Sequence, residues 1–269
     1  MDNPKMFCYQ CQETARGTGC NILGVCGKHP ETSARMDLLL YAVRGISIIN
    51  RALRAKAEPL READHLVIDA LFTTITNANF DNEAIIARIH NTLSVRRTLI
   101  LQVKDTSGLP EAAFWDIKTK DGSDASDDVL FAKAKEAGVL STKDEDIRSL
   151  RELITYGLKG LSAYSKHANV LLSDDPEIDA FLQRALAATL DDSLTADDLI
   201  ALTLETGNYG VRGMAMLDTA NTGAYGNPEI TRVNIGVGKN PGILVSGHDL
   251  KDLEMLLEQT QGTGVDVYT

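Results

Sequence analysis

The segment that decides the fold is the run Asp37-Leu38-Leu39-Leu40-Tyr41-Ala42-Val43-Arg44-Gly45-Ile46-Ser47. A similar run follows at an offset of 115 residues and reads Glu152-Leu153-Ile154-Thr155-Tyr156-Gly157-Leu158-Lys159-Gly160-Leu161-Ser162. Residues 68–72 and 178–182 also correspond, at an offset of 110. Self-similarity of this kind indicates an internal duplication, in which each copy is one structural unit.

The first copy has the apolar spacing of helices. Between Glu31 and Lys56, apolar residues recur at the i, i+3, i+4 and i+7 positions that are typical of an amphipathic helix. We expect two further helices, over 62–78 and 82–101. Residues 104–128 are polar and rich in Gly, Asp and Ser, which predicts a long surface loop. A short helix is expected to follow over 128–137.

The second copy repeats this order. Its first helix is expected over about 148–168, and its second contains 178–182. The third begins at Thr195-x-x-Asp198, which has the form of a capping box, and Gly207 is its expected stop. Three helices in each copy predict two three-helix bundles that pack together.

Two glycines, Gly45 and Gly160, lie at equivalent mid-helix positions in the two copies. Glycine inside a helix costs about 1 kcal/mol relative to alanine. We therefore expect a close helix–helix contact at both positions.

The pattern changes near residue 222. Residues 231–237 and 242–246 are expected to be strands, followed by a helix over 250–261 with Asp249 as its N-cap and a third strand over 265–269. This order is the opening of a β-α-β unit of the Rossmann-like type. Three strands and one helix cannot cover both faces of a parallel sheet, so either this α/β piece packs on the bundles or the chain is the front part of something longer. The last strand ends without a following loop, which favours truncation.

The fold class is therefore a mainly α domain followed by the start of an α/β domain. The expected division is a cysteine loop over 1–28, two three-helix bundles over 29–222, and an α/β segment over 223–269.

Composition excludes several classes of protein. The 269 residues carry 27 Lys and Arg against 38 Asp and Glu, for a net charge of −11, and show no basic cluster. This balance disfavours partners such as nucleic acids and anionic membranes. No apolar run reaches the ~18 residues of a membrane-spanning helix, and the start of the chain lacks the order of a signal peptide. A cytoplasmic location is the expectation.

All four cysteines, Cys8, Cys11, Cys20 and Cys26, lie in the first 26 residues. Their spacing, C-x2-C-x8-C-x5-C, indicates a shared ligand, because structural core cysteines would be scattered along the chain. A reducing cytoplasm disfavours disulfides. A zinc site usually has two short cysteine pairs, and only the first pair here is short. Uneven spacing favours an iron–sulfur cluster, with structural zinc as the alternative.

Two segments carry a resemblance to a known family. The run Met6-Phe7-Cys8-Tyr9-Gln10-Cys11-Gln12-Glu13-Thr14 resembles the start of the hybrid-cluster proteins, also called the prismane or hydroxylamine reductase family. The cysteine spacing resembles the class whose proximal cluster is a 4Fe–4S cubane. The segment from Tyr225 to Asp252, with its Ser-Gly-His-Asp motif, is also similar to the family. Related nickel carbon monoxide dehydrogenases share parts of this architecture but differ in their cysteine pattern.

The resemblance implies an oxidoreductase that reduces hydroxylamine to ammonia, with nitric oxide as a proposed physiological substrate. The cubane passes electrons to a hybrid iron–sulfur–oxygen cluster, and the motif makes His248 a ligand of that cluster. The remaining ligands lie beyond Thr269 in the family, so the resemblance covers about the first half of a member and this chain alone is expected to be inactive. A redox donor protein and a small nitrogen substrate are the implied partners.

Two alternative functions remain open at this point. One is a stand-alone electron carrier or redox sensor that uses only the cubane. The other is a structural zinc module on a helical scaffold. Absorbance separates them, because an iron–sulfur cluster is brown and zinc is colourless.

Overall fold

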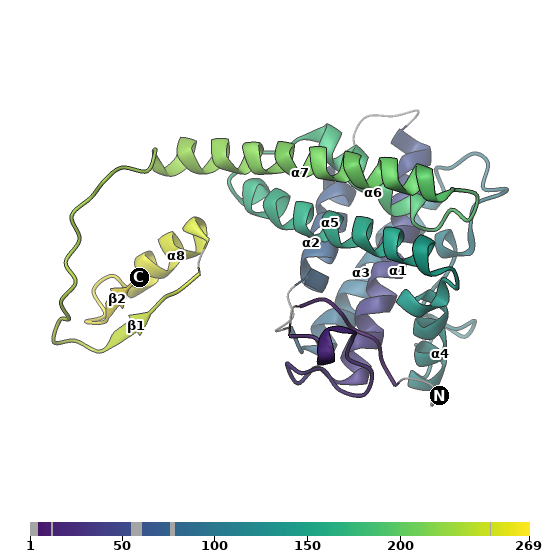
Figure 1. The fold of residues 1–269 in the computed structure, drawn as a ribbon, viewed down its shortest axis with the longest axis horizontal. Coiled ribbons are helices and arrows are strands. Elements are labelled where there is room, and N and C mark those ends of the chain that lie inside the picture. The colour runs from purple at the N-terminus through teal and green to yellow at the C-terminus, as the bar shows by residue number, and fades with distance from the viewer. Residues whose placement is uncertain (1–4, 12, 55–60, 76–78, 248) are drawn as a thin grey trace.

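The structure is a computed structural model that describes residues 5–11, 13–54, 61–75, 79–247 and 249–269. It is mainly α, as expected (Figure 1). The helices of the first copy are α1 (Pro30–Arg54), α2 (Arg61–Ile75) and α3 (Asn82–Ile100). Those of the second are α5 (Glu145–Val170), α6 (Pro176–Ala188) and α7 (Ala196–Tyr225), with α4 (Asp127–Ala137) between the copies. None of the helices described is both long and apolar enough to cross a membrane.

Side-chain caps fix where several of these helices begin. Asp81, Asp144 and Asp175 each accept a hydrogen bond from a backbone amide in the first turn of the helix that follows. Thr195 and Asp198 form the expected capping box at the start of α7. Such caps satisfy amides that have no partner inside the helix. The capping box at Thr195 is the one of these signals that was predicted from the sequence, whereas α5 begins three residues before the expected position 148.

The expected end of the third helix at Gly207 is wrong. α7 continues through Gly207 for 18 more residues and ends at Tyr225. Gly226, with φ of 83°, provides the helix cap instead. A single glycine costs a helix only about 1 kcal/mol, whereas a positive φ strongly favours a residue without a Cβ. The stop therefore lies directly before Asn227 and Pro228.

α1 is surrounded on all sides. It contacts α2, α3, α4, α6 and the 3-10 turn η2 (Glu111–Ala113). Seventeen of its 25 residues are buried, against eight of 26 in α5. A helix that is apolar on every side is a central helix. The amphipathic pattern expected for this segment predicts only one buried face, so more of α1 is buried than expected. The surface loop expected over 104–128 is also partly inside, since Ala112, Ala113 and Ile117 are buried against α1.

The two helix triplets contact one another in a reciprocal manner. Within each copy the three helices contact one another, and between the copies α1 contacts α6 while α2 contacts α5. The first helix of each copy thus contacts the second helix of the other copy, which is the pattern of a two-fold interface. The superposition of helices 32–56 and 148–168 as equivalents stays a prediction, and so do the domain boundaries.

The equivalent glycines Gly45 and Gly160 differ in their surroundings. A Cβ on Gly45 would overlap the backbone carbonyl oxygen of Ala112 in η2. A Cβ on Gly160 would meet nothing within 4 Å. The expected close contact is therefore present at Gly45, with a 3-10 turn rather than a helix, and is wrong at Gly160.

The C-terminal segment forms a small β-α-β unit. β1 (Gly242–Leu244) pairs in parallel with β2 (Asp266–Tyr268), and α8 (Leu250–Thr260) connects them, with Asp249 as its N-cap. The strand expected over 231–237 is wrong. This stretch runs exposed from α7 to β1 (Figure 1), without a ladder partner among the described residues. Strands need a neighbour to satisfy their backbone groups, and none is present here.

The contact at Gly45 generates a matched pair of predictions. Gly45→Ala forces η2 away from α1 and should lower the free energy of unfolding by about 1–3 kcal/mol, the usual cost of overpacking. Gly160→Ala replaces a glycine inside a helix at a position with open space for a Cβ. This substitution should raise the free energy of unfolding by about 0.5–1 kcal/mol. Denaturant unfolding followed by circular dichroism measures both. Equal effects of the same sign would contradict the structural difference between the two positions.

Candidate functional site

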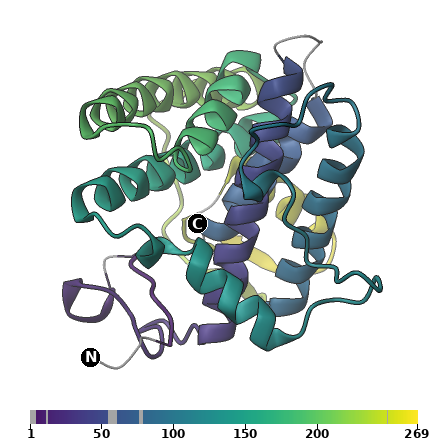
Figure 2. The same cartoon turned by 90° about the vertical axis from the view of Figure 1, so that its right-hand side faces the viewer.

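The four cysteines lie on one loop, residues 5–29, which precedes α1 and covers one end of the helical body (Figure 2). Cys8 and Cys20 face each other in an antiparallel bridge. Their backbones exchange two hydrogen bonds, of 3.0 Å from the Cys8 amide and 2.7 Å from the Cys20 amide. The bridge brings the first and third cysteines of the motif together.

The environment of Cys20 favours its thiolate. Its side chain is buried, which raises the pKa of the thiol. Hydrogen bonds from the amides of Ala15 and Val25 outweigh that effect and hold the pKa below its usual value, with help from Thr14 and the Lys28 charge. The Ala15 nitrogen lies 3.4 Å from the Cys20 sulfur. A thiolate is the form that binds metals.

One glycine shows how tightly the loop is folded. Gly19 has a φ of 138°, and a Cβ there would lie 2.5 Å from the Phe7 ring. Both the backbone conformation and the space therefore require glycine directly before Cys20.

All four cysteines are free thiols; Cys20 is buried, Cys8 and Cys11 are partly buried, and Cys26 is exposed. In the described part of the chain, no three Cys, His, Asp or Glu side chains are already close enough together to hold one metal ion. The donor set is that of a four-thiolate site, but binding requires the sulfurs to move together.

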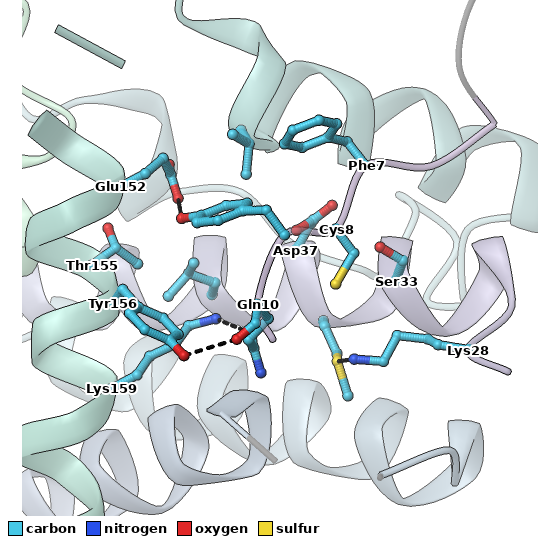
Figure 3. Close-up of a pocket in the computed structure, with 14 residues that line it drawn as sticks. Phe7, Cys8, Gln10, Lys28, Ser33, Asp37, Glu152, Thr155, Tyr156 and Lys159 are labelled. Atoms are coloured by element: carbon cyan, nitrogen blue, oxygen red, sulfur yellow. Dashed lines mark hydrogen bonds between the residues drawn. The ribbon is translucent and has the colours of Figure 1, made fainter. Parts of the chain in front are cut away.

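The loop is anchored to helices more than a hundred residues away in sequence. The Tyr9 hydroxyl donates to Glu152 at 2.8 Å, and the Tyr156 hydroxyl donates to the Gln10 carbonyl at 2.8 Å. Lys159 donates to the Gln10 side-chain oxygen at 3.0 Å, as Figure 3 shows. The Gln10 amide nitrogen donates to the carbonyls that end α2, including that of Ile75 at 2.6 Å. The two residues between Cys8 and Cys11 are thus held by both copies of the duplication.

Four charged side chains gather beside this anchor. Asp37 and Arg44 come from α1, and Glu152 and Lys159 are their counterparts in α5. Arg44 lies 4.0 Å from Glu152, and Asp37 interacts electrostatically with Lys159. The cation of each copy therefore faces the acid of the other.

Burial shifts the pKa values of this group. It raises the pKa of Asp37 to about 7, while the nearby Lys159 charge limits the rise. It lowers the pKa of Lys159 to about 8, against the opposing effect of Asp37 and Glu152. Burial also lowers the pKa of Arg44. Asp37, Glu152 and Lys159 line a cavity of about 50 Å³ together with Cys8 and Lys28 (Figure 3).

Sequence reasoning missed this polar group, although a signal was present. The duplicated runs share an acid, a tyrosine and a base at spacings of four and three residues, which places them on one helix face. In the first copy these are Asp37, Tyr41 and Arg44. Polar residues repeated in phase inside otherwise apolar helices could have been recognised as candidates.

His248, the expected ligand of a second cluster, lies outside the described residues. Its neighbour Asp249 caps α8 and lies 3.0 Å from the Nδ1 atom of His167 in α5. His65 and His90 are likewise paired with aspartates, Asp174 and Asp124. His65, His90 and His167 therefore each have a carboxylate partner.

Comparisons of the sequence with known proteins show what this chain is similar to. Residues 6–269 match the Prismane/CO dehydrogenase family. The chain is 56% identical over 265 residues to a hydroxylamine reductase of Desulfovibrio desulfuricans, covering 98% of this chain and 47% of that protein. Hydroxylamine reductases of Acetivibrio thermocellus and Clostridium tetani are 56% and 54% identical, over 98% of this chain and 47% and 50% of theirs. The chain thus spans about half the length of these curated relatives.

The pKa of Asp37 generates a prediction for stability against pH. An unfolded aspartate titrates near 3.9, whereas Asp37 in the fold titrates at about 7. Between these values the folded state holds the extra proton, so the free energy of unfolding of the metal-free protein should fall as pH rises from ~4 to ~7. Asp37→Asn should make this slope shallower, as measured by urea unfolding between pH 5 and 8.

Asp121→Asn is the control, because hydrogen bonds from Thr119 and Ser123 hold the pKa of Asp121 at about 2. Asp121 is then ionised in both the folded and the unfolded protein throughout this pH range. Asp121→Asn should therefore not change the slope of the free energy of unfolding against pH. An Asp37→Asn slope equal to that of the unmodified chain would contradict the assigned protonation.

Proposed function

The chain belongs to the Prismane/CO dehydrogenase family, and we propose that its cysteine loop holds a 4Fe–4S cluster through Cys8, Cys11, Cys20 and Cys26. The observation that carries the proposal is the loop itself: four free thiols, with backbone amides directed at the buried Cys20 sulfur. Four thiolates are the usual ligands of such a cluster, and hydrogen bonds to sulfur tune it.

Lys28 provides a second observation in favour of an anionic group. Its ammonium is buried beside the loop, and its hydrogen-bond partner is the Met36 thioether sulfur at 3.2 Å. A buried charge normally has a countercharge. An iron–sulfur cluster with four thiolate ligands is negatively charged, so the residues around the loop fit this group.

When bound, a cluster of this type supplies one-electron transfer. The protein's own residues hold the loop in place. Tyr9 and Gln10 fix the first two ligands against α2 and α5. The amides of Ala15 and Val25 stabilise the Cys20 thiolate. The exposed Cys26 gives one side of the site access to solvent, which is where an electron donor protein would approach.

For the complete protein we propose the activity that the relatives are named for, the reduction of hydroxylamine. Conversion of hydroxylamine to ammonia and water consumes two electrons and two protons, so it requires a donor protein and a path for single electrons. His248 would bind the hybrid cluster at which a substrate such as hydroxylamine or nitric oxide reacts. A reducing cytoplasm is the compartment that keeps the four thiols free.

A stand-alone electron carrier or redox sensor is the second candidate. It is favoured by the position of all four cysteines on one loop of this chain. A site capped by four thiolates leaves no open position for a substrate, which suits electron transfer alone.

The cluster assignment predicts the iron content. After anaerobic reconstitution the chain should bind about four irons and absorb broadly near ~400 nm, the spectrum of a thiolate-bound iron–sulfur cluster. Cys20→Ser and Cys26→Ser should each lose most of this iron, because each removes one thiolate ligand. Iron and sulfide analysis with absorbance measures both. Ser94→Ala, at an exposed position of α3 away from the loop, is the control and should keep the iron. One tightly bound zinc per chain would contradict the assignment.

The position of the chemistry gives a further prediction. Residues 1–269 alone should not turn over hydroxylamine with dithionite, because four-thiolate coordination offers no open iron. A protein extended to the length of the relatives should be active, and His248→Ala in that protein should abolish most of its activity. Ammonia release against a protein-free control measures this. Turnover by residues 1–269 would show that the reaction does not need the missing half.

A further inference from the structure

Lys28 is a buried cation that forms no ion pair in the described part of the chain, although its charge acts on Asp37. Its side chain is 2% exposed, among the most deeply buried large side chains of the described chain. No carboxylate in the described residues lies within ion-pair distance of its ammonium, which instead contacts the uncharged Met36 sulfur. Burial of an unpaired ammonium is strongly unfavourable, so the fold keeps this charge for a reason other than its own stability.

The other charges around the cavity balance one another. Above the pKa of Asp37, which is about 7, Asp37 and Glu152 supply two negative charges, and Arg44 and Lys159 supply two positive charges. Below that pH the region is more positive still. Each acid interacts with both cations. Lys28 is therefore the surplus positive charge of this buried region.

The surplus charge lies at the cysteines. Lys28 follows Cys26 by two residues, and its carbonyl accepts a 2.8 Å hydrogen bond from the Gly24 amide, which folds this end of the loop back on itself. It lines the same cavity as Cys8, and its charge acts on Cys20. In Figure 3, Lys28 and Lys159 enter the view from opposite sides of Cys8. The Lys28 charge thus acts on Cys20, Lys28 shares a cavity with Cys8, and it lies two residues from Cys26 in sequence.

We propose that Lys28 is the countercharge of the iron–sulfur cluster and raises its reduction potential. This inference rests on the proposed function, because it needs the cluster to be present. Reduction adds one electron and so one negative charge to the site. A fixed positive charge nearby stabilises the reduced state more than the oxidised state, and burial keeps this interaction strong because solvent and salt do not screen it. Lys28 is a positioning and tuning residue, since substrate is not expected to touch it.

The test is a redox titration of the reconstituted chain, followed by absorbance and electron paramagnetic resonance. Lys28→Met removes the charge and keeps an unbranched side chain against Met36. At the midpoint potential of the unmodified protein, we expect the ratio of reduced to oxidised cluster to fall at least tenfold, which corresponds to about 59 mV for a one-electron couple. Lys28→Arg keeps the charge and should keep a potential close to that of the unmodified chain.

Lys5→Met is the matched control, because it makes the same chemical change on the same loop at an exposed position. Solvent screens that charge, so its small effect should disappear when salt is raised from 0.1 to 1 M, where the Debye length shortens from about 10 to about 3 Å. The effect of Lys28→Met should persist at 1 M salt.

The outcomes separate the two proposals. If the unmodified chain binds no iron–sulfur cluster, the proposed function fails. If both proteins bind four irons and their potentials are equal, or the variant has the higher one, the role of Lys28 is wrong and the cluster assignment stands. If Lys28→Met binds no iron, recovery of iron by Lys28→Arg supports the charge as the cause, and failure of both variants overturns it.

Discussion

Burial of α1 on every side is the constraint from which the rest of the molecule follows. Because α2, α3, α4, α6 and η2 all pack on it, one helix supplies core to both copies of the duplication. Such packing leaves no room for an added methyl group at Gly45, where η2 reaches the helix backbone. It also fixes the direction in which the preceding loop must leave, since α1 begins at Pro30, four residues after Cys26. The position of the cysteines is therefore set by the core.

The two similar sequence runs lie on two helices that have one pattern and two different roles. α1 and α5 carry the same order of acid, tyrosine and base, yet α1 is central and α5 has one exposed face. The acids and bases meet crosswise, Arg44 with Glu152 and Lys159 with Asp37. On α5 the tyrosine and the base are free to bind the backbone and side chain of Gln10. Two helices with the same sequence pattern thus support an asymmetric site, because the N-terminal loop is bound by the tyrosine and the base of α5.

The sequence was sufficient for features that depend on near neighbours. The box of Thr195 with Asp198, the cap at Asp249 and the helical class of both copies depend on residues a few positions apart. Errors arose where a distant partner decides. α7 continues through Gly207, and residues 231–237 have no neighbouring strand among the described residues. Gly160 faces open space, although its counterpart Gly45 is tightly packed. The cysteines were recognised by their spacing, whereas Lys28 and Gln10 were not, because their roles depend on the interior that they enter.

The anchor of the cysteine loop has a consequence for how the protein is made. Tyr9 and Gln10 bind residues that lie 143–149 positions later in the chain. A ribosome adds about 5–20 residues per second, so the loop emerges roughly 8–30 s before Lys159 has been synthesised. During that interval the four thiols have no α5 to hold them. If the loop holds the proposed cluster, iron and sulfide would find it supported by the fold only after α5 has emerged, and a nascent chain that received metal earlier would bind it without that support.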